Sequence, residues 1–519
     1  MFKLNTSTKV AVIGAGSMGS GIAQLAAQAG HRVLLFDAKE AAAGWALDRI
    51  GADLAGAVKR GRMDEPTREA TMARLHAVST VNELEGVGLV VEAIVEKLEP
   101  KQALFRQLEQ VLDEKAVLAT NTSSISITAL AQGLNHSRRV IGWHFFNPAP
   151  RMRLVEIVCG LDTAPELAAE MFKLSKAWGK TPVAAPNAPG FIVNRVARPY
   201  YAEGLRLLAE GLAPLQVIDR LLREAGGFSL GPFELIDLIG ADVNLAVTES
   251  VFAATQWDPR YAPNLIQQEL VRAGRWGRKS GRGFYDYRPN GAKDAVKLEA
   301  LALAAEGEVP ALRVAAHAGL LAPLVERLRA AGVSVRSDTT LPEETLAIND
   351  QVRVALTDGR TATQRVANEA QSASYGTAGG ALLLLDLARD YATTPVLGAC
   401  ASAGHEAALG TLAALLKPAG IELLALKDVA GLAVMRIVCG LANEAADVMT
   451  WTGTAAADID IAMVLGTAYP VGPLAWADAI GPSRVVQVLR HLHAHYGEVR
   501  YRISPRLSQA HHAGMSLHA

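Results

Sequence analysis

Cysteine is scarce in this chain of 519 residues, which has three cysteines and no CxxC spacing, so a disulfide framework or thiolate metal site is not expected. The chain also has almost no net charge. The 51 lysines and arginines are matched by 52 aspartates and glutamates, which leaves no basic field for nucleic acid or an anionic membrane. No apolar run reaches the ~20 residues of a membrane helix. These absences predict a cytoplasmic protein that acts on a small molecule.

Apolar residues are abundant, at 50% of the chain, whereas charged residues make up 20%, so large cores can form and a disordered chain is excluded. The length suits about three to four domains of roughly 150 residues. Strand-like and helix-like segments alternate through the first third of the chain, which is typical of a doubly wound α/β domain.

The first chemical motif lies within residues 9–38. An apolar strand runs into Gly14-Ala-Gly16-Ser-Met-Gly19, and an alanine-rich helix and a second strand ending at Asp37 follow. In a dinucleotide site the first glycine makes a tight turn, the second admits the pyrophosphate and the third packs helix on strand. A carboxylate at Asp37 would bind a ribose 2′-hydroxyl and repel a 2′-phosphate, so the segment predicts NAD. The alternative is that the glycines only shape a turn.

The remaining elements of this domain follow from the same pattern. The sequence predicts helices at 40–60, 66–75 and 98–113 and strands at 88–95, 116–121, 139–145 and 153–158. After about residue 187 the period becomes helical, with few strand candidates before "GRGFYDY" at 281–287.

His144 ends one apolar run and Glu156 lies inside the next, in "WHFFNPAPRMRLVEIV". Proton removal from an alcohol suits imidazole, the side chain whose ordinary pKa lies near neutrality, and a carboxylate on the far ring nitrogen would fix its tautomer. A histidine beside two phenylalanines is more often a packed strand-end residue. These sixteen residues alone leave both interpretations open.

Several motifs, taken in order, resemble those of the (S)-3-hydroxyacyl-CoA dehydrogenase family. After the glycine loop come "LVVEAIVEKLEPKQALF", "ATNTSSISIT", "WHFFNPAPRMRLVEIV", "PGFIVNRVARPYY", "GPFELIDLIG" and "GRKSGRGFYDY". The resemblance covers residues 8–287. Segments such as "DLIGADVNLAVTESVF" are most similar to the longer bacterial members that serve phenylacetate breakdown and oxidise 3-hydroxyadipyl-CoA.

The resemblance implies an NAD-dependent oxidation of a 3-hydroxyacyl-CoA thioester to the 3-oxo product. It makes His144 the general base and Glu156 the residue that orients it. Ser123 and Asn194 match the family's substrate-facing positions, where they would bond the 3-hydroxyl or the thioester carbonyl and so orient the substrate.

The resemblance also implies cofactor contacts at Glu96, Lys101, Ser123, Asn147 and Lys279. Simpler interpretations exist for most of them. Ser123 could be a helix N-cap, Glu96 and Lys101 could be solvated charges where a helix begins, and Asn147 could only form a turn before a proline.

Lys59, Arg60 and Arg62 end a predicted helix near the position where the family holds the nucleotide end of coenzyme A. The alternative is that the helix dipole favours basic residues at this helix C-terminus without any role in substrate binding.

The second half of the chain repeats the helical part of the first. A shift of 241 residues places 176–195 over 417–436 and 231–240 over 472–481, with Met435 where Asn194 stands. The sequence predicts four parts: an NAD-binding Rossmann domain at 1–187, a helical substrate and dimerisation domain at 188–290, a reduced Rossmann-like region at 291–420, and a degenerate second helical domain at 421–519. The repeat suggests either a homodimer or an internal pseudo-dimer.

Six of the twelve histidines follow residue 490. His491 and His495 would share a helix face, but no cysteine or carboxylate cluster joins them, so we expect no metal and instead a solvated helix and a loose tail.

Three functional alternatives stay open at this stage. The enzyme could act on 3-hydroxybutyryl-CoA or on short and medium acyl chains in general, or a related oxidoreductase could use a sugar acid. The third is a protein that binds NAD without turnover. The acyl chain length is not set by any residue pattern.

Overall fold

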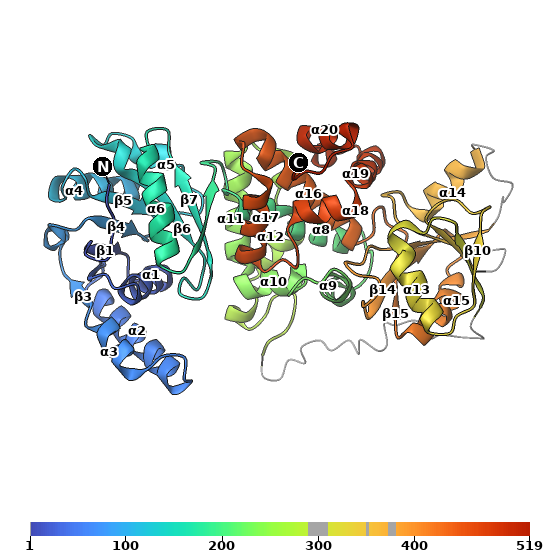
Figure 1. The fold of residues 1–519 in the computed structure, drawn as a ribbon, viewed down its shortest axis with the longest axis horizontal. Helices are drawn as coiled ribbons and strands as arrows, with labels where there is room; N and C mark the ends of the chain where they lie inside the picture. The colour runs from blue at the N-terminus through green and yellow to red at the C-terminus, as the bar shows by residue number, and fades with distance from the viewer. Residues whose placement is uncertain (1, 289–309, 349–351, 372–379) are drawn as a thin grey trace. The chain divides into compact units, whose positions relative to one another are not determined.

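The computed structural model describes residues 2–288, 310–348, 352–371 and 380–519, and Figure 1 traces the chain as a ribbon. Its internal contacts divide into two compact units. The first comprises residues 1–195 together with 457–467, and the second comprises residues 196–456 together with 468–519.

The first unit contains a sheet of eight strands in the order β3-β2-β1-β4-β5-β6-β7-β8. All neighbours are parallel except β6 and β7, which form an antiparallel pair. The strands are β1 Val10–Ile13, β2 Val33–Phe36, β3 Leu75–Val78, β4 Leu89–Glu92, β5 Val117–Thr120, β6 Val140–Phe145, β7 Leu154–Cys159 and β8 Thr181–Ala185. Its helices are α1 Ser17–Gln28, α2 Ala42–Lys59, α3 Glu65–Met72, α4 Leu98–Val111, α5 Ile127–Ala131 and α6 Pro165–Ala177, with short 3₁₀ turns at Val81–Leu84 and Ser137–Arg139.

The central strands β1, β4 and β5 are buried along their whole length, which explains their continuous apolar sequences: helices cover both faces of a parallel sheet. The predicted doubly wound α/β fold is therefore confirmed. The prediction missed β3 and β8, which are the two edge strands. Pro182 lies within β8, and proline is tolerated at an edge because one side of the strand needs no ladder hydrogen bonds.

Two helical repeats and a second sheet make up the second unit, except that residues 457–467 of α17 belong to the first unit. In the first repeat the helices are α8 Arg198–Ala209, α9 Leu215–Arg220, η3 Leu221–Ala225, α10 Pro232–Ile239, α11 Ala241–Ala254, η4 Pro259–Tyr261 and α12 Leu265–Arg272, after α7 Val193–Val196 at the boundary and before η5 Arg278–Ser280. In the second they are α16 Val434–Thr452, α17 Ala456–Thr467, α18 Pro473–Ile480, α19 Pro482–Tyr496, η9 Val499–Tyr501 and α20 Pro505–Ala513.

The shift of 241 residues aligns the elements of these repeats by residue number, from α8 and α16 to α12 and α20. The turn between α10 and α11 and its counterpart between α18 and α19 are an example, because Gly240 and Gly481 have φ angles of 102° and 93°. The two equivalent helices α8 and α16 pack against each other. Arg436 of α16 donates from Nε to Glu203 of α8 at 2.6 Å, so a buried ion pair joins the repeats.

The second sheet has seven strands among the described residues, in the order β10-β9-β11-β12-β13-β14-β15. They are β9 Leu312–Ala315, β10 Val335–Asp338, β11 Thr345–Ile348, β12 Val352–Leu356, β13 Ala381–Leu385, β14 Val396–Ala401 and β15 Glu422–Ala425. The helices α13 Ala322–Ala330, α14 Ala362–Gln371 and α15 Ala408–Leu416 and the 3₁₀ turns η7 Gly319–Leu321 and η8 Lys417–Ala419 complete this region.

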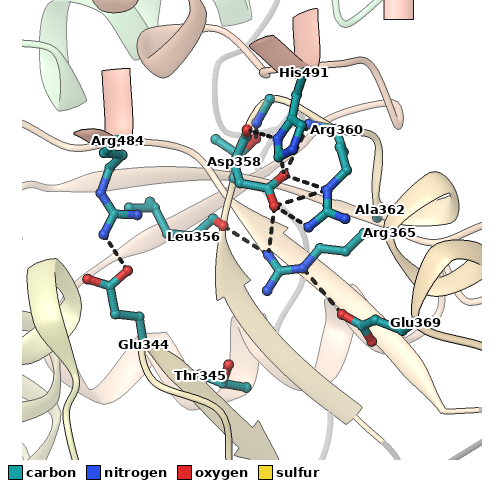
Figure 2. Close-up of polar contacts among 12 residues, drawn as sticks. Glu344, Thr345, Leu356, Asp358, Arg360, Ala362, Arg365, Glu369, Arg484 and His491 are labelled. Atoms are coloured by element: carbon teal, nitrogen blue, oxygen red, sulfur yellow. Dashed lines mark hydrogen bonds and ion pairs between the residues drawn. The ribbon is translucent and has the colours of Figure 1, made fainter. Parts of the chain in front are cut away.

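Charged side chains fill the space beyond the end of β12, as Figure 2 shows. Asp358 accepts hydrogen bonds from Arg360 and lies 4.0 Å from Arg365, and its backbone carbonyl bonds His491 Nδ1 at 2.7 Å. Burial opposes ionisation of Asp358, but the two guanidinium groups outweigh it and lower the pKa of that carboxyl. Glu369 Oε1 lies 3.4 Å from Arg365 Nε, so a second carboxylate offsets the second guanidinium group.

Two expectations about the helical parts are wrong. The chain after residue 504 is not a loose tail, since it forms α20, buries Leu517, and places His518 Nδ1 2.8 Å from Asp478. The strand candidate at 281–287 forms only isolated bridges, in which Arg282 pairs with Gly277 and Asp286.

None of the helices in the described ranges is long and apolar enough to cross a membrane. Likewise, within these ranges no group of three or more His, Cys, Asp or Glu side chains is placed to hold a metal ion.

Candidate active site

The glycine loop joins β1 to α1 and is shaped by close backbone contacts. Gly14 has a φ of 105°, and a Cβ there would lie 2.4 Å from the carbonyl of Ala93. At Gly19 a Cβ would lie 1.7 Å from the Gly14 carbonyl, so helix and strand could not pack as they do. A Cβ at Gly16 would meet nothing within 4 Å. Packing therefore explains Gly14 and Gly19. At Gly16 the backbone is open, as a dinucleotide site requires for the approach of a pyrophosphate.

The start of α1 carries no side-chain cap, so amide groups of its first turn point outward with the positive end of the helix dipole. Asp37, just after β2, accepts from the amides of Ala15 at 2.7 Å and Lys39 at 2.8 Å. Ser17 Oγ donates to Asn147 Oδ1 at 3.3 Å, which places Asn147 beside the loop. These groups fit a dinucleotide.

The antiparallel register of β6 and β7 places His144 directly opposite Glu156. Their side chains meet, with His144 Nδ1 2.6 Å from Glu156 Oε2, and both residues are buried. The eleven residues between them are the end of β6, the connection and the start of β7. Since Nδ1 is held by the carboxylate, Nε2 is the nitrogen left to exchange a proton.

The second oxygen of Glu156 accepts from the backbone. Ile192 and Val193 donate their amides to Oε1 at 3.0 and 3.1 Å. Just before them, Phe191 has a φ of 49°, unusual for a side chain of its size. Asn194 follows directly in α7, so the carboxylate that holds the imidazole also fixes the backbone that carries Asn194.

Glu96 accepts hydrogen bonds from polar groups that follow β5. Its Oε1 accepts from Thr122 Oγ1 at 2.6 Å and from the Ser123 amide at 2.9 Å. Burial opposes ionisation of Glu96, but Lys101 and these hydrogen bonds prevail and lower its pKa. Lys101 is 1% exposed and lies 2.6 Å from Glu92, so it is not a solvated charge.

Ser123 is also not a helix N-cap, because Ser126 caps α5 by accepting from Ala129. Ser123 Oγ lies 3.4 Å from Glu96 instead. Lys279 belongs to the second unit, where its ammonium pairs with Asp242 at 2.6 Å.

A cavity of about 580 Å³ lies in the first unit between α1, α2 and the segment after β6. Arginines dominate its charged lining, against a single aspartate, Asp53; the arginines are Arg49, Arg60, Arg62 and Arg151. Lys59 is exposed at the end of α2 and does not line the cavity. Of the three basic residues predicted to bind the substrate, Arg60 and Arg62 therefore line the cavity and Lys59 does not.

Sequence reasoning missed Arg49 and Asn121. Arg49 donates to the carbonyl of Ala15 at 2.8 Å and to Ser20 Oγ at 3.2 Å. Its spacing of eleven residues from Arg60, three helical turns, was a usable signal. Asn121 Oδ1 accepts from the Phe145 amide at 2.8 Å and so fixes the end of β6 next to His144.

Family models match most of the chain. The 3-hydroxyacyl-CoA dehydrogenase NAD-binding domain matches residues 9–188, and the C-terminal domain of the same family matches 190–287 and again 431–517. A 3-hydroxybutyryl-CoA dehydrogenase reduced Rossmann-fold domain matches 354–429. The 3-hydroxyadipyl-CoA dehydrogenase of Escherichia coli K12 is 41% identical over 98% of both chains.

The chain belongs to the 3-hydroxyacyl-CoA dehydrogenase family. It is accordingly an NAD-dependent oxidoreductase, as the glycine loop predicted. A crystal structure titled 3-hydroxybutyryl-CoA dehydrogenase from Escherichia coli K12 has a TM-score of 0.87 at 40% identity, covering 98% of this chain and 99% of that one. A probable 3-hydroxybutyryl-CoA dehydrogenase of Bacillus subtilis is 39% identical over 97% of its length but only 54% of this chain. The shorter relative therefore matches only about half of this chain.

Proposed function

We propose that the chain oxidises an (S)-3-hydroxyacyl-CoA to the 3-oxoacyl-CoA, with His144 as general base and Glu156 as its positioning residue. The observation that carries this proposal is the 2.6 Å contact between His144 Nδ1 and Glu156 Oε2, set by the register of β6 and β7. NAD, when bound, accepts the hydride.

His144 Nε2 takes the hydroxyl proton as the C3–H bond breaks and its electron pair leaves with the hydride, so that the C–O bond becomes a carbonyl. Glu156 keeps Nδ1 protonated and stabilises the imidazolium that forms. Phe146 and Phe191 lie beside the ring, with centroids 4.5 and 5.7 Å away, and limit the access of water.

Cofactor binding falls to the glycine loop and its surroundings. Gly14, Gly16 and Gly19 with the first turn of α1 would hold the pyrophosphate, and Asp37 the adenosine ribose. We assign the remaining cofactor contacts to the positions that carry the family motifs: Glu96, Lys101, Ser123, Asn147 and Lys279.

Substrate binding has two parts. Ser123 and Asn194 would hold the 3-hydroxyl and the thioester carbonyl. The basic cavity suits the phosphates of coenzyme A, because Arg60, Arg62 and Arg151 line it and planar guanidinium groups bind phosphate oxygens in pairs. Lys59, exposed at the end of α2, would contribute only positive charge near the cavity.

We propose 3-hydroxyadipyl-CoA as the substrate, because the long relative of that name matches 98% of this chain. 3-Hydroxybutyryl-CoA is the second candidate, favoured by the name of the structure with a TM-score of 0.87. We further propose the four-part division at residues 187, 290 and 420, a cytoplasmic location, and an internal pseudo-dimer, supported by the packing of α8 on α16.

A rate series over CoA thioesters tests this function. We expect NADH formation with 3-hydroxyacyl-CoA substrates, and a kcat/KM for 3-hydroxyadipyl-CoA at least tenfold above that for 3-hydroxybutyryl-CoA. A reversed order would select the second candidate. Turnover of a free sugar acid, with none of either thioester, would contradict the proposal.

A further inference from the structure

Lys180 lies just before β8 and is buried, although the proposed chemistry makes no use of it. The residue is 7% exposed. Burial lowers the pKa of Lys180 to about 8, and no carboxylate in the described part of the chain raises it again. Burying a cation without a counter-ion is costly, so its hydrogen-bond partners are what hold it in this place.

Those partners are two backbone carbonyls in the connection between β6 and β7. The Nζ of Lys180 donates to the carbonyl of Ala149 at 2.5 Å and to that of Met152 at 2.7 Å. The parallel register of β7 and β8, which pairs Thr181 with Leu154, brings Lys180 alongside this connection. Hydrogen bonds from a charged donor are about twice as strong as neutral ones, so the ammonium group fixes both ends of the segment 149–152.

The same segment forms part of the wall of the basic cavity. Ala149, Pro150 and Arg151 line this cavity of about 580 Å³. Arg151 is exposed and lies between the two carbonyls that Lys180 holds. The segment also meets α1, where a Cβ at Gly21 would lie 3.0 Å from Pro150 Cδ. Lys180 and α1 therefore hold the segment, and Arg151 with it, at the cavity.

The second half of the chain forms the same turn without a lysine. Adding 241 to Lys180 gives Ile421, which is buried and directly precedes β15. The backbone is alike in the two places, since Lys180 donates its amide to the carbonyl of Ser175 and Ile421 donates its amide to that of Leu416, again a shift of 241. The entry to the strand therefore does not require a lysine, and the lysine stands in the half that carries the basic cavity.

We propose that Lys180 is a positioning residue for substrate binding: its ammonium group holds the segment 149–152 so that Arg151 stays at the cavity and binds a phosphate group of coenzyme A. The inference rests on the proposed function, because it takes the basic cavity as the coenzyme A site. In this role Lys180 contacts neither substrate nor NAD and acts through Arg151. Its loss should weaken substrate binding and leave hydride transfer at His144 intact.

The test is a double-mutant cycle in the full chain with Lys180→Met and Arg151→Met. Methionine is similar in length to lysine but has no N–H group, so the two carbonyls lose their donor. We expect each single variant to raise KM for the 3-hydroxyacyl-CoA about tenfold and to leave kcat within about twofold, as for a lost binding contact. Isothermal titration calorimetry with free coenzyme A should show the same loss of affinity.

The double variant separates a positioning role from an independent one. If Lys180 acts through Arg151, the loss of both should raise KM no more than the loss of Arg151 alone, about tenfold. Independent contributions would multiply to about a hundredfold, and that result would overturn the proposal.

Arg139→Met is the matched control. Arg139 is also a buried cation that donates to backbone carbonyls, those of Asp113 and Ala116. It directly precedes β6 and so lies at the opposite end of that strand from His144. Its loss should lower Tm, whereas KM, kcat and the affinity for coenzyme A stay as they are. An equal rise of KM in this variant would reduce the effect of Lys180→Met to general destabilisation and contradict the proposal.

If Lys180→Met does not fold, Lys180→Gln takes its place in the cycle. Its neutral amide keeps two N–H groups, so we expect a smaller rise of KM, about threefold. The proposal fails if the variant at Lys180, or Arg151→Met, leaves KM and the affinity for coenzyme A unchanged. A lowered kcat with an unaltered KM would also refute it. Failure of the proposed function is distinguishable, because the unaltered chain would then turn over neither thioester.

Discussion

The two halves of the chain place a buried carboxylate on the same kind of turn, but only the first adds a histidine. In the first half Glu156 accepts the amides after Phe191, whose φ is 49°. In the second half Asp386, just after β13, accepts the amides after Leu432, whose φ is 53°. Residues 191 and 432 are related by the shift of 241, so the strained turn belongs to the repeat and not to the chemistry.

The comparison assigns Glu156 two tasks. One oxygen fixes the entry to the helical repeat, as Asp386 does in the second half, and the other orients His144. Where the second half lacks the histidine, Met435 also stands at the position of Asn194. A buried carboxylate that holds this turn is thus found both with and without the proposed catalytic groups beside it.

The two halves also differ at the ends of their strands, β1 in the first half and β12 in the second. Backbone at Gly16 is open in the first half, whereas beyond β12 the groups of Asp358, Arg360 and Arg365 bind one another. Because these side chains pair with one another, fewer of them are left for a cofactor, which agrees with the family match to a reduced Rossmann-fold domain.

The largest expected effect on turnover comes from His144→Gln, which removes the group that the second half lacks. An amide cannot take up the proton, so we expect kcat to fall about a hundredfold or more, because general-base catalysis supplies roughly that factor. Steady-state NADH formation measures it. NADH affinity, from fluorescence titration, should stay unchanged. An unaltered pH–rate profile in this variant would remove His144 as the base.

A smaller effect is expected from Gly466→Leu in α17, a helix that belongs to the first unit. A Cβ at Gly466 would lie 2.7 Å from Leu154 Cδ2 and 3.0 Å from Val193 Cγ2, so a larger side chain displaces the neighbours of Glu156. We expect kcat to fall about tenfold, with a stability loss of ~1–3 kcal/mol from overpacking.

Gly398→Leu is the matched control in the second sheet. A Cβ at Gly398 would lie 2.8 Å from Leu426 Cδ1 and 3.1 Å from Leu221 Cδ1. It should cost similar stability in urea unfolding and leave kcat unchanged. Equal loss of kcat in both variants would mean that overpacking anywhere impairs turnover.

Asp37→Ala should alter the choice of cofactor more than the rate. Without the carboxylate, repulsion of a 2′-phosphate is relieved, so we expect the ratio of kcat/KM for NAD to that for NADP to fall about tenfold. Initial rates with each cofactor measure the ratio. Equal kcat/KM values in the unaltered enzyme would refute the role of Asp37.

The smallest effect on turnover, and a clear effect on stability, is expected at Asp219. Burial raises the pKa of Asp219 to about 7, although hydrogen bonds from Tyr285 and from the Phe233 and Glu234 amides oppose the shift. The folded state therefore holds this proton where the unfolded state releases it. The stabilisation is complete below about pH 4 and is lost as pH rises through about 7.

Asp219→Asn should remove that part of the pH dependence while kcat stays unchanged. Urea unfolding at pH 5 and pH 8 gives the comparison, since each unit of pKa shift corresponds to about 1.4 kcal/mol. An identical difference between the two pH values in the variant and the unaltered chain would contradict the assignment.

Patterns local to the chain were predictable. The glycine loop, Asp37 and the pair His144 and Glu156 each follow a strand pattern whose register or end position is fixed by the alternation of apolar segments. The edge strands β3 and β8 were missed because they are short, and an edge has weaker sequence demands than a buried strand.

Groups that come together only through tertiary packing could not be predicted. Arg49 joins Arg151 in one cavity although about a hundred residues separate them. Asp386 gave no motif, since its partners are backbone amides, which any sequence supplies. The order of the C-terminal segment likewise rests on contacts such as His518 with Asp478.

The most direct test of the comparison is to measure kcat, its pH dependence and Tm for Glu156→Gln and Asp386→Asn side by side. If the turn is shared structure and chemistry belongs to the first half, both variants lower Tm. In that case Glu156→Gln also lowers kcat, by somewhat less than His144→Gln, and changes the pH profile, whereas Asp386→Asn leaves kcat and its pH profile as they are. An equal fall of kcat in Asp386→Asn, or an unaltered kcat in Glu156→Gln, would contradict the account.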